Sequence, residues 1–322
     1  MFRGFLDFAA QAMQGLIPEN RLLYKPITLH IQTLKAARGG SLGSETLYLK
    51  PKTLDEAISQ LAAGGQILAG GTDFYPALGE RLPQGRVVDI TSLSEIRGIS
   101  FQPEWIRVGG LTTWSDVIRA PLPPCFDALK AAAREIGSVQ IQNRGTVAGN
   151  LCNASPAADG VPPLLALDAE VELVSLAGRR RMPLSEFLQG NRKTSRRTEE
   201  ILAAVWVPRT LEQAASVFLK LGARRFLVIS ISMVAAMVLV DVHGRVAAAR
   251  IAVGSCSATA QRLRDLEGAL LGIPVKDVAG MVKPRHLAAL RPIDDVRATG
   301  EYRTDASLTL VRRALSACVE AG

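Results

Sequence analysis

The sequence feature that most constrains the fold is the segment at residues 136–160, IGSVQIQNRGTVAGNLCNASPAADG. It follows residues 126–136, whose pattern predicts a helix, and it contains almost no bulky polar side chain. Most of its members are small or carry an amide: Gly145, Thr146, Ala148, Gly149, Asn150, Asn153, Ala154 and Ser155. Glycine adopts positive φ at little cost, and N–H groups beside small side chains can converge on an anion. The segment is therefore predicted to be a loop whose backbone contacts a phosphate.

A second segment of the same character lies earlier in the chain. A short apolar strand leads into two glycines in the sequence Ile67, Leu68, Ala69, Gly70, Gly71, Thr72, Asp73 and Phe74. Each charge-assisted bond from such a loop to a phosphate oxygen contributes roughly 1.5 to 3 kcal/mol. Two loops of this kind can share one diphosphate. Taken alone, each is also compatible with a plain turn.

The rest of the chain alternates predicted strands and helices. A first lobe has strands at 47–49, 66–69 and 86–90, and a helix at 54–61 that Thr53 and Glu56 cap. A second lobe has strands at 105–109, 170–175 and 201–207, a helix capped by Thr113, and helical runs at 126–136 and 164–167. This lobe is predicted to be mixed α/β with an antiparallel sheet.

A third part begins near residue 214. Its segment 226–240 is the longest apolar run, with fifteen residues and no charge, but it falls short of the about twenty residues that cross a bilayer. A turn at 241–245 follows, so a buried hairpin with the strand 246–253 is preferred to a membrane span. Helices are predicted at 261–271, closed by Gly272, and at 307–319.

Composition excludes several classes of function. The formal charge is +8, but aromatic residues are scarce and do not alternate with the arginine clusters as in single-strand binders, which argues against nucleic acid. Cys125, Cys152, Cys256 and Cys318 form no CxxC pair, so the sequence predicts neither a zinc site nor an iron–sulfur cluster. They are predicted to be reduced thiols of a cytoplasmic protein. Cys152 is predicted to be a small buried residue, with a place near a flavin as the alternative.

Six motifs occur in an order that resembles one family: GGTD, VVDITSLSEIRGI, IGSVQIQNRGTVAGNLCNASPAADGVPPLLALDAEVEL, EEILAAVWVP, FLKLGARRF and EYRTDASLTLVRRAL. They resemble the FAD-binding medium subunit of molybdenum hydroxylases, the group of xanthine dehydrogenase, aldehyde oxidase and aerobic carbon monoxide dehydrogenase. The resemblance covers about residues 47–317. It implies an α+β protein: a two-lobed FAD-binding fold of the PCMH/vanillyl-alcohol-oxidase type and a C-terminal α/β domain with an antiparallel sheet.

The resemblance also implies which residues bind the cofactor. Residues 67–74 match the segment that wraps the FAD diphosphate in the family. Thr146, Val147, Ala148, Gly149 and Asn150 match the segment usually written TIGGN; the methyl of Ala148, at a common glycine position, is tolerated where φ is negative. Ile136, Asp159, Leu202 and Lys220 match further cofactor contacts. For Asp159 the alternative is a helix cap before Pro162, and for Lys220 a solvated charge on a strand.

The implied function is that of an electron-transfer subunit. No catalytic side chain or metal ligand is expected, because the flavin carries the redox chemistry, and His30, His243 and His286 lie outside both loops. The expected partners are a small subunit with [2Fe-2S] clusters and a large subunit with the molybdenum cofactor, and electrons would leave the FAD for NAD or another acceptor. Xanthine, an aldehyde, nicotinate or another N-heterocycle, and carbon monoxide all fit as substrates. The alternatives are a stand-alone flavin oxidoreductase of the same fold and a flavin-free scaffold subunit.

The predicted domain boundaries follow from these patterns. Residues 46–100 form FAD-binding lobe 1, residues 101–212 lobe 2, and residues 213–322 the C-terminal domain. Residues 1–45 stand outside the resemblance and are expected to be an extension that is disordered or packs on a partner subunit, or the product of an upstream start codon. This segment is not a convincing export signal, because Asp7 interrupts its apolar core.

Overall fold

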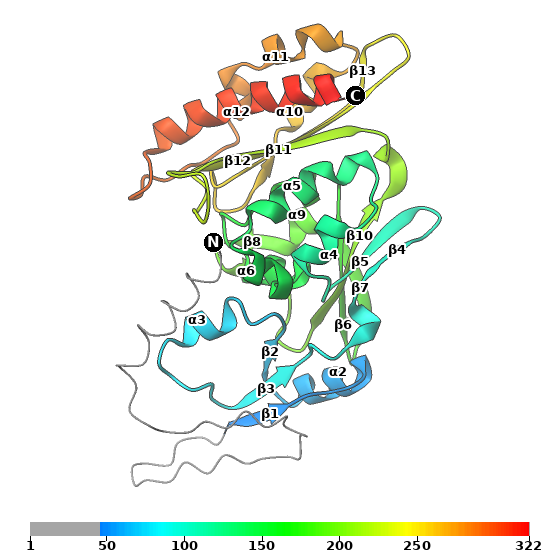
Figure 1. The fold of residues 1–322 in the computed structure, drawn as a ribbon, viewed down its shortest axis with the longest axis vertical. Coiled ribbons are helices and arrows are strands. Elements are labelled where there is room, and N and C mark those ends of the chain that lie inside the picture. The colour runs from blue at the N-terminus through cyan, green and yellow to red at the C-terminus, as the bar shows by residue number, and fades with distance from the viewer. Residues whose placement is uncertain (1–45, 322) are drawn as a thin grey trace, which may run out of the picture. The chain divides into compact units, whose positions relative to one another are not determined.

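The computed structural model describes residues 46–321, which belong to one compact unit. The predicted extension at residues 1–45 lies outside the described residues. The fold is α+β, with one parallel sheet, two larger antiparallel sheets and a two-stranded ribbon (Figure 1). Within residues 46–321, no helix is both long and apolar enough to cross a bilayer.

The first sheet is parallel and has the order β1-β3-β2. Its elements are β1 (Leu47–Leu49), α2 (Leu54–Ala62), β2 (Gln66–Leu68), α3 (Phe74–Leu78) and β3 (Arg86–Asp89). Thr53 caps α2 as predicted, because its hydroxyl accepts the Glu56 N–H at 3.2 Å. One face of α2, formed by Leu54, Ala57, Ile58 and Leu61, is buried in the core of this part. The loop that follows β2 is the first of the two glycine-rich segments.

The second sheet is antiparallel, in the order β4-β5-β10-β6-β7. Its strands are β4 (Ile99–Phe101), β5 (Trp105–Gly109), β6 (Glu170–Ser175), β7 (Gly178–Pro183) and β10 (Ile201–Pro208). The associated elements are α4 (Trp114–Arg119), α5 (Asp127–Glu135), α6 (Val139–Arg144), α7 (Val147–Asn153), α8 (Val161–Ala166), α9 (Leu184–Phe187) and the ribbon of β8 (Leu188–Gly190) and β9 (Lys193–Thr194). Short 3-10 helices occupy Ser94–Ile96, Pro124–Phe126, Arg209–Leu211, Val275–Asp277 and Pro284–Leu287. Thr113 caps α4, as predicted, and it also forms a full capping box with Asp116.

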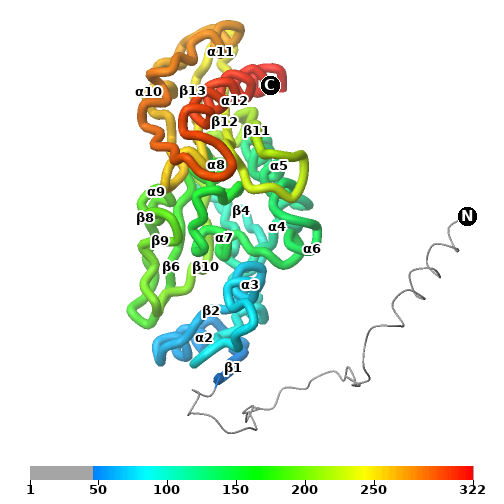
Figure 2. Tube along the Cα trace, turned by 90° about the vertical axis from the view of Figure 1, so that its left-hand side faces the viewer, coloured from blue at the N-terminus to red at the C-terminus, as the bar shows by residue number. Residues whose placement is uncertain are grey.

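The third sheet, also antiparallel, has the order β11-β12-β13-β14 and is covered on both faces. It consists of β11 (Ala215–Leu221), β12 (Ser232–Val240), β13 (Val246–Gly254) and β14 (Gln261–Arg262), followed by α10 (Arg264–Leu270), α11 (Val278–Met281) and α12 (Gly300–Ala321). Figures 1 and 2 show α12 running along β11 and β12, while α5 and α8 contact the sheet from the other side. Because alternate residues of a strand face opposite sides, Met233, Ala235 and Met237 join the core of the second part. Val234, Ala236 and Val238 join the C-terminal core, which explains the continuous apolar run.

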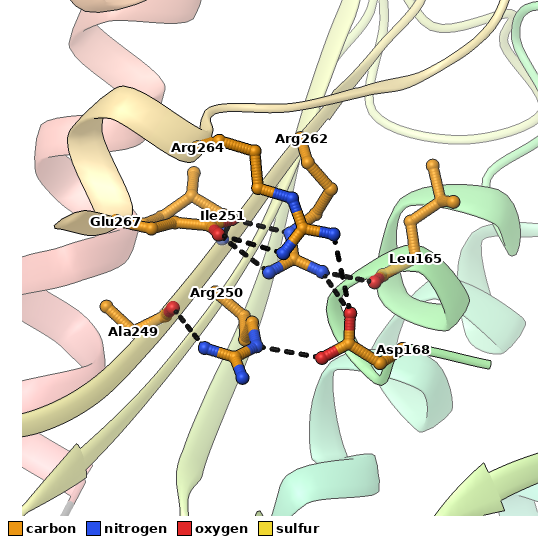
Figure 3. Close-up of polar contacts among 8 residues, drawn as sticks. All are labelled: Leu165, Asp168, Ala249, Arg250, Ile251, Arg262, Arg264 and Glu267. Carbon is orange, nitrogen blue, oxygen red and sulfur yellow. Dashed lines mark hydrogen bonds and ion pairs between the residues drawn. The ribbon is translucent and has the colours of Figure 1, made fainter. Parts of the chain in front are cut away.

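A cluster of charges ties the C-terminal sheet to the loop after α8 (Figure 3). Asp168 accepts hydrogen bonds from Arg250 Nε at 2.9 Å and from Arg262 Nη1 at 2.7 Å. Arg262 also donates to Glu267 and to the Leu165 carbonyl, so its buried guanidinium is paired on both sides. The backbone of Asp168 is in the left-handed region, with φ of 50°.

Three sequence-based boundaries are wrong. The strand expected at 226–240 begins only at Ser232, and Phe226, Leu227 and Ile229 are exposed. The helix expected at 261–271 is shorter, because Gln261 and Arg262 pair with Val253 and Ala252 as β14 before α10 begins. The helix expected at 307–319 is longer, Gly300–Ala321. Hydrophobic periodicity does not mark these ends, since β12 and β14 are set by strand pairing and α12 begins in polar contacts with Asp294 and Thr299.

Candidate cofactor-binding cleft

A cleft of about 680 Å³ lies between the two glycine-rich segments and the start of β10. It brings together most of the predicted site residues: Ile67, Ala69, Gly70, Gly71, Thr72, Asp73, Phe74, Ile136, Thr146, Ala148, Gly149, Asn150 and Leu202. Segments that are far apart in the sequence thus form one binding site. A volume of this size is typical of a site for a small-molecule cofactor.

The first segment presents its backbone to the cleft. Gly71 has φ of +77°, so the glycine is required by the turn. A Cβ on Gly70 would lie 2.0 Å from the Arg144 carbonyl oxygen, so this glycine lets the two segments touch. Among the described residues, the N–H groups of residues 70–73 donate to no other protein group. They are therefore free to bind an anion, as the sequence predicts.

The second segment is helical rather than a loop. Residues 139–144 form α6 and residues 147–153 form α7, so Gly145 and Gly149 do not take positive φ. Thr146 caps α7, and its hydroxyl accepts the Gly149 N–H at 3.0 Å. The N–H groups of Val147 and Ala148 donate to the carbonyls of Thr112 and Gly110 at 2.9 and 3.2 Å. These two amides are already used, unlike those of residues 70–73, and are not free to bind an anion.

The second segment contributes a side chain instead. The Asn150 Oδ1 atom is buried and has no hydrogen-bond partner among the described residues. A buried amide oxygen without a partner is costly, so a ligand donor at this point of the cleft would be stabilising. Ala148 lies inside α7 and does not have a positive φ. This is the backbone conformation in which its methyl group was predicted to be tolerated. Asn153 donates to Asp73 at 3.0 Å and so joins the two segments.

Four predicted site residues do not line the cleft. Leu68 and Val147 are buried behind its walls. Asp159 Oδ2 accepts a hydrogen bond from Lys220 Nζ at 2.7 Å, and Oδ1 accepts one from Ser230 at 2.6 Å. Both charged side chains of this pair are less than a tenth exposed.

Both alternatives for this pair are wrong. The residue at the N-cap of α8 is Gly160, so Asp159 does not cap that helix. Lys220 is not solvated, because its ammonium is buried against a carboxylate. Burial raises the pKa of Asp159 above its usual value, and the nearby Lys220 charge and hydrogen bonds from Lys220 and Ser230 offset only part of that effect.

The cleft has further lining residues that were not predicted as cofactor contacts, except that a place near a flavin was the alternative for Cys152: Gly65, Gln66, Ile90, Gly110, Leu111, Trp114, Ile141, Gly145, Cys152, Asn153, Arg196, Thr198 and Ile201. Gly145, Cys152 and Asn153 belong to the segment 136–160, so their position in that segment could have identified them as lining residues. Cys152 is in the cleft wall, where burial raises the pKa of its thiol to about 11, against the opposing effect of the Arg196 charge. It is therefore a neutral thiol. Arg196 belongs to no sequence motif, and only the folded structure brings it near the residues of α7 that line the cleft.

The fold and the cleft define a dinucleotide-binding α+β protein with an antiparallel C-terminal domain. Residues 41–210 match the model of the FAD binding domain in molybdopterin dehydrogenase, and residues 217–318 match that of the CO dehydrogenase flavoprotein C-terminal domain. The chain is 33% identical over 281 residues to the putative xanthine dehydrogenase FAD-binding subunit of Escherichia coli K12, covering 85% of this chain and 96% of that one. It is 37% identical over 193 residues to the nicotinate dehydrogenase FAD-subunit of Eubacterium barkeri, covering 57% and 65%.

A solved relative has the same fold. A chain of carbon monoxide dehydrogenase from Hydrogenophaga pseudoflava superposes with a TM-score of 0.76 at 28% identity, over 85% of this chain and 97% of that one. The chain therefore belongs to the FAD-binding medium subunits of the molybdopterin dehydrogenases, the family of xanthine and carbon monoxide dehydrogenases. It is an oxidoreductase subunit of a heteromeric complex, as its motifs predict.

Proposed function

We propose that this subunit holds FAD in the cleft and passes electrons from the iron–sulfur clusters of a small partner subunit to NAD or another acceptor. A large partner subunit would carry the molybdenum cofactor and hydroxylate the substrate. The relatives are named for xanthine and for nicotinate, and both are N-heterocycles; an aldehyde or carbon monoxide also fits. The free thiols favour a cytoplasmic location. We also propose residues 46–100 as FAD-binding lobe 1, residues 101–212 as lobe 2 and residues 213–322 as the C-terminal domain.

One observation carries the proposal: the cleft holds hydrogen-bond donors and a hydrogen-bond acceptor that have no partner among the described residues. The four N–H groups of residues 70–73 suit the diphosphate, and the Asn150 oxygen suits a donor of the cofactor. Gly70 and Gly71 leave room for a close backbone approach. FAD, when bound, supplies the redox chemistry, while these residues bind it, orient it and exclude water.

The four matched residues outside 67–74 and 146–150 have separate roles in the proposal. Ile136 and Leu202 line the cleft and would contact the cofactor through apolar surface. The Asp159–Lys220 pair is buried beside β12, where it would fix the position of the C-terminal sheet toward the cofactor. We propose this positioning role for the pair in place of direct contact with FAD, because neither side chain lines the cleft.

The test is the visible spectrum of the purified chain, with the released cofactor identified by chromatography. Wild type is expected to carry FAD, and Gly71→Trp and Gly149→Trp are expected to lose it because an indole fills the cleft. Gly268→Ala is the matched control, since nothing lies within 4 Å of its Cβ. A colourless wild type that FAD cannot reconstitute would favour a flavin-free scaffold. Full turnover with a substrate by the isolated chain would instead favour a stand-alone flavin oxidoreductase.

A further inference from the structure

We infer that Arg196 is a further cofactor-binding residue, which supplies the positive charge that neutralises the diphosphate of the bound dinucleotide. The inference rests on the proposed function and goes beyond its two glycine-rich segments. Arg196 lies in the connection between β9 and β10, outside every motif of the sequence analysis. It lines the same cleft as Thr72 and Asn150.

Arg196 is the one cationic residue among those that line the cleft in the described part of the chain. The other lining residue with a full charge is Asp73, which is exposed and accepts a hydrogen bond from Asn153. No carboxylate of the described residues lies within ion-pair distance of Arg196. Its charge also acts on the Cys152 thiol, which places the guanidinium at the cleft wall.

The guanidinium is held in place by carbonyl groups. Arg196 Nη1 donates to the carbonyl oxygens of Glu200 at 2.8 Å, Arg197 at 3.0 Å and Thr198 at 3.3 Å. These acceptors fix the side chain but do not neutralise it. The remaining N–H groups, on Nε and Nη2, have no acceptor among the described residues. An arginine that is already ordered loses little rotamer freedom when it binds an anion.

The two nearest acidic side chains in sequence make their contacts elsewhere. Glu199 accepts a hydrogen bond from the Thr198 hydroxyl at 3.1 Å and, among the described residues, forms no ion pair with Arg196. Glu200 is paired with Arg180 through two bonds of 2.7 and 2.8 Å and also accepts the Arg197 N–H at 2.7 Å. It is almost fully buried, so it cannot turn toward the cleft without breaking this pair. The charge of Arg196 is therefore left for a ligand.

A diphosphate is the part of FAD that such a charge fits. The N–H groups of residues 70–73 offer hydrogen bonds but no net charge, and a nearby cation further stabilises two phosphate charges that are moved out of water. The flavin and adenine rings are neutral and are matched by apolar lining residues such as Ile136 and Leu202. Arg196 and the first segment would then share the diphosphate between them.

The experiment measures binding of FAD and of riboflavin, which lacks the diphosphate, to the cofactor-free chain by fluorescence titration. Arg196→Gln is expected to weaken FAD about 10- to 100-fold, the range of one charge-assisted hydrogen bond, and to change riboflavin less than about threefold. The dependence of FAD affinity on sodium chloride should also become shallower in this variant. Arg196→Lys keeps the charge and should recover most of the affinity. Arg197→Gln is the matched control, because its side chain is exposed and does not line the cleft.

Two results would overturn the inference while leaving the proposed function intact. One is unchanged FAD affinity and salt dependence in Arg196→Gln. The other is an equal loss for FAD and riboflavin, with the salt dependence of the wild type, because it would show that Arg196 only holds the 197–200 turn. Failure of the wild type to bind FAD would instead contradict the proposed function itself.

Discussion

At the scale of single residues, Gly70 sets the contact between the two cofactor-binding segments. A methyl group there would meet the Arg144 carbonyl oxygen at 2.0 Å, so Gly70→Ala must push the segments apart. We expect loss of FAD binding and a destabilisation of about 1 to 3 kcal/mol, as for other overpacked sites. Thermal unfolding and flavin content measure the two effects. Gly268→Ala in α10, with open space at its Cβ, should be neutral or stabilise by up to about 1 kcal/mol.

The buried Asp159–Lys220 pair gives a second prediction at this scale. Lys220→Met leaves the carboxylate without its counter-charge, which should destabilise the protein by roughly 3 to 5 kcal/mol at neutral pH. The folded-state pKa of Asp159 is already raised by burial, so stability contributed by its protonated form is lost as pH rises through that pKa. The deficit of Lys220→Met should therefore shrink as pH falls toward the ordinary range of aspartate. Urea unfolding at several pH values measures it. A deficit that grows in acid would contradict this account.

Restoring neutrality tests the same pair independently. Asp159→Asn combined with Lys220→Met removes both charges, and we expect it to be more stable than Lys220→Met alone. The amide of the new side chain can still accept from Ser230, which now donates to Asp159 Oδ1. If the double variant is no better than the single one, the lost stability comes from packing and not from the unpaired charge.

At the scale of elements, α7 depends on its first residue. The Thr146 hydroxyl accepts the Gly149 N–H, and Thr146→Val removes this cap while keeping the shape. A lost N-cap costs about 1 kcal/mol, or about 1 to 2 °C in melting temperature for a protein of this size. Thr146→Ser should retain the wild-type value in the same thermal scan. Weaker FAD binding should accompany the valine variant, because α7 carries Asn150 into the cleft.

The elements also show what can be predicted from a sequence and what cannot. Glycine and threonine at segment ends, as at Thr53, Thr113 and Gly71, are local signals, and the structure confirms them. The 136–160 segment looked like a loop because its residues are small, yet 139–144 form α6 and 147–153 form α7, whose first amides donate to carbonyls in the Gly110–Thr112 turn. The partners that decide the matter are more than thirty positions away. Arg196 was missed for the same reason.

At the scale of the whole molecule, the C-terminal sheet belongs to two cores. Met233 and Met237 of β12 pack toward the FAD-binding part, and Val234 and Val238 pack toward α12. A strand that is buried on both faces transmits displacement from one core to the other. The two parts are therefore expected to unfold together, and polar contacts at their junction should affect the stability of both.

Asp168 is the carboxylate that tests this coupling. Burial raises its pKa, but the Arg262 charge and hydrogen bonds from Arg250 and Arg262 outweigh that effect and hold the pKa below its usual value. A lowered pKa contributes stability above the unfolded-state pKa of about 3.9, and this contribution is lost as pH falls through the folded-state pKa. Asp168→Asn should thus destabilise by about 1 kcal/mol at neutral pH, a modest value because the side chain is 38% exposed. The difference from wild type should disappear in acid.

The stability difference between Asp168→Asn and the wild type is measured by urea unfolding at neutral and at acidic pH. Flavin fluorescence and circular dichroism follow each unfolding transition. The two signals should change together in the wild type. Arg264→Gln is the control, because Arg264 is 63% exposed and lies 3.7 Å from Asp168, and it should shift stability by less than about 0.5 kcal/mol. A pH-independent difference for Asp168→Asn would mean that the charge of Asp168 is not what joins the parts. Separate flavin and circular dichroism transitions in the wild type would mean that the shared faces of β12 do not couple the two cores.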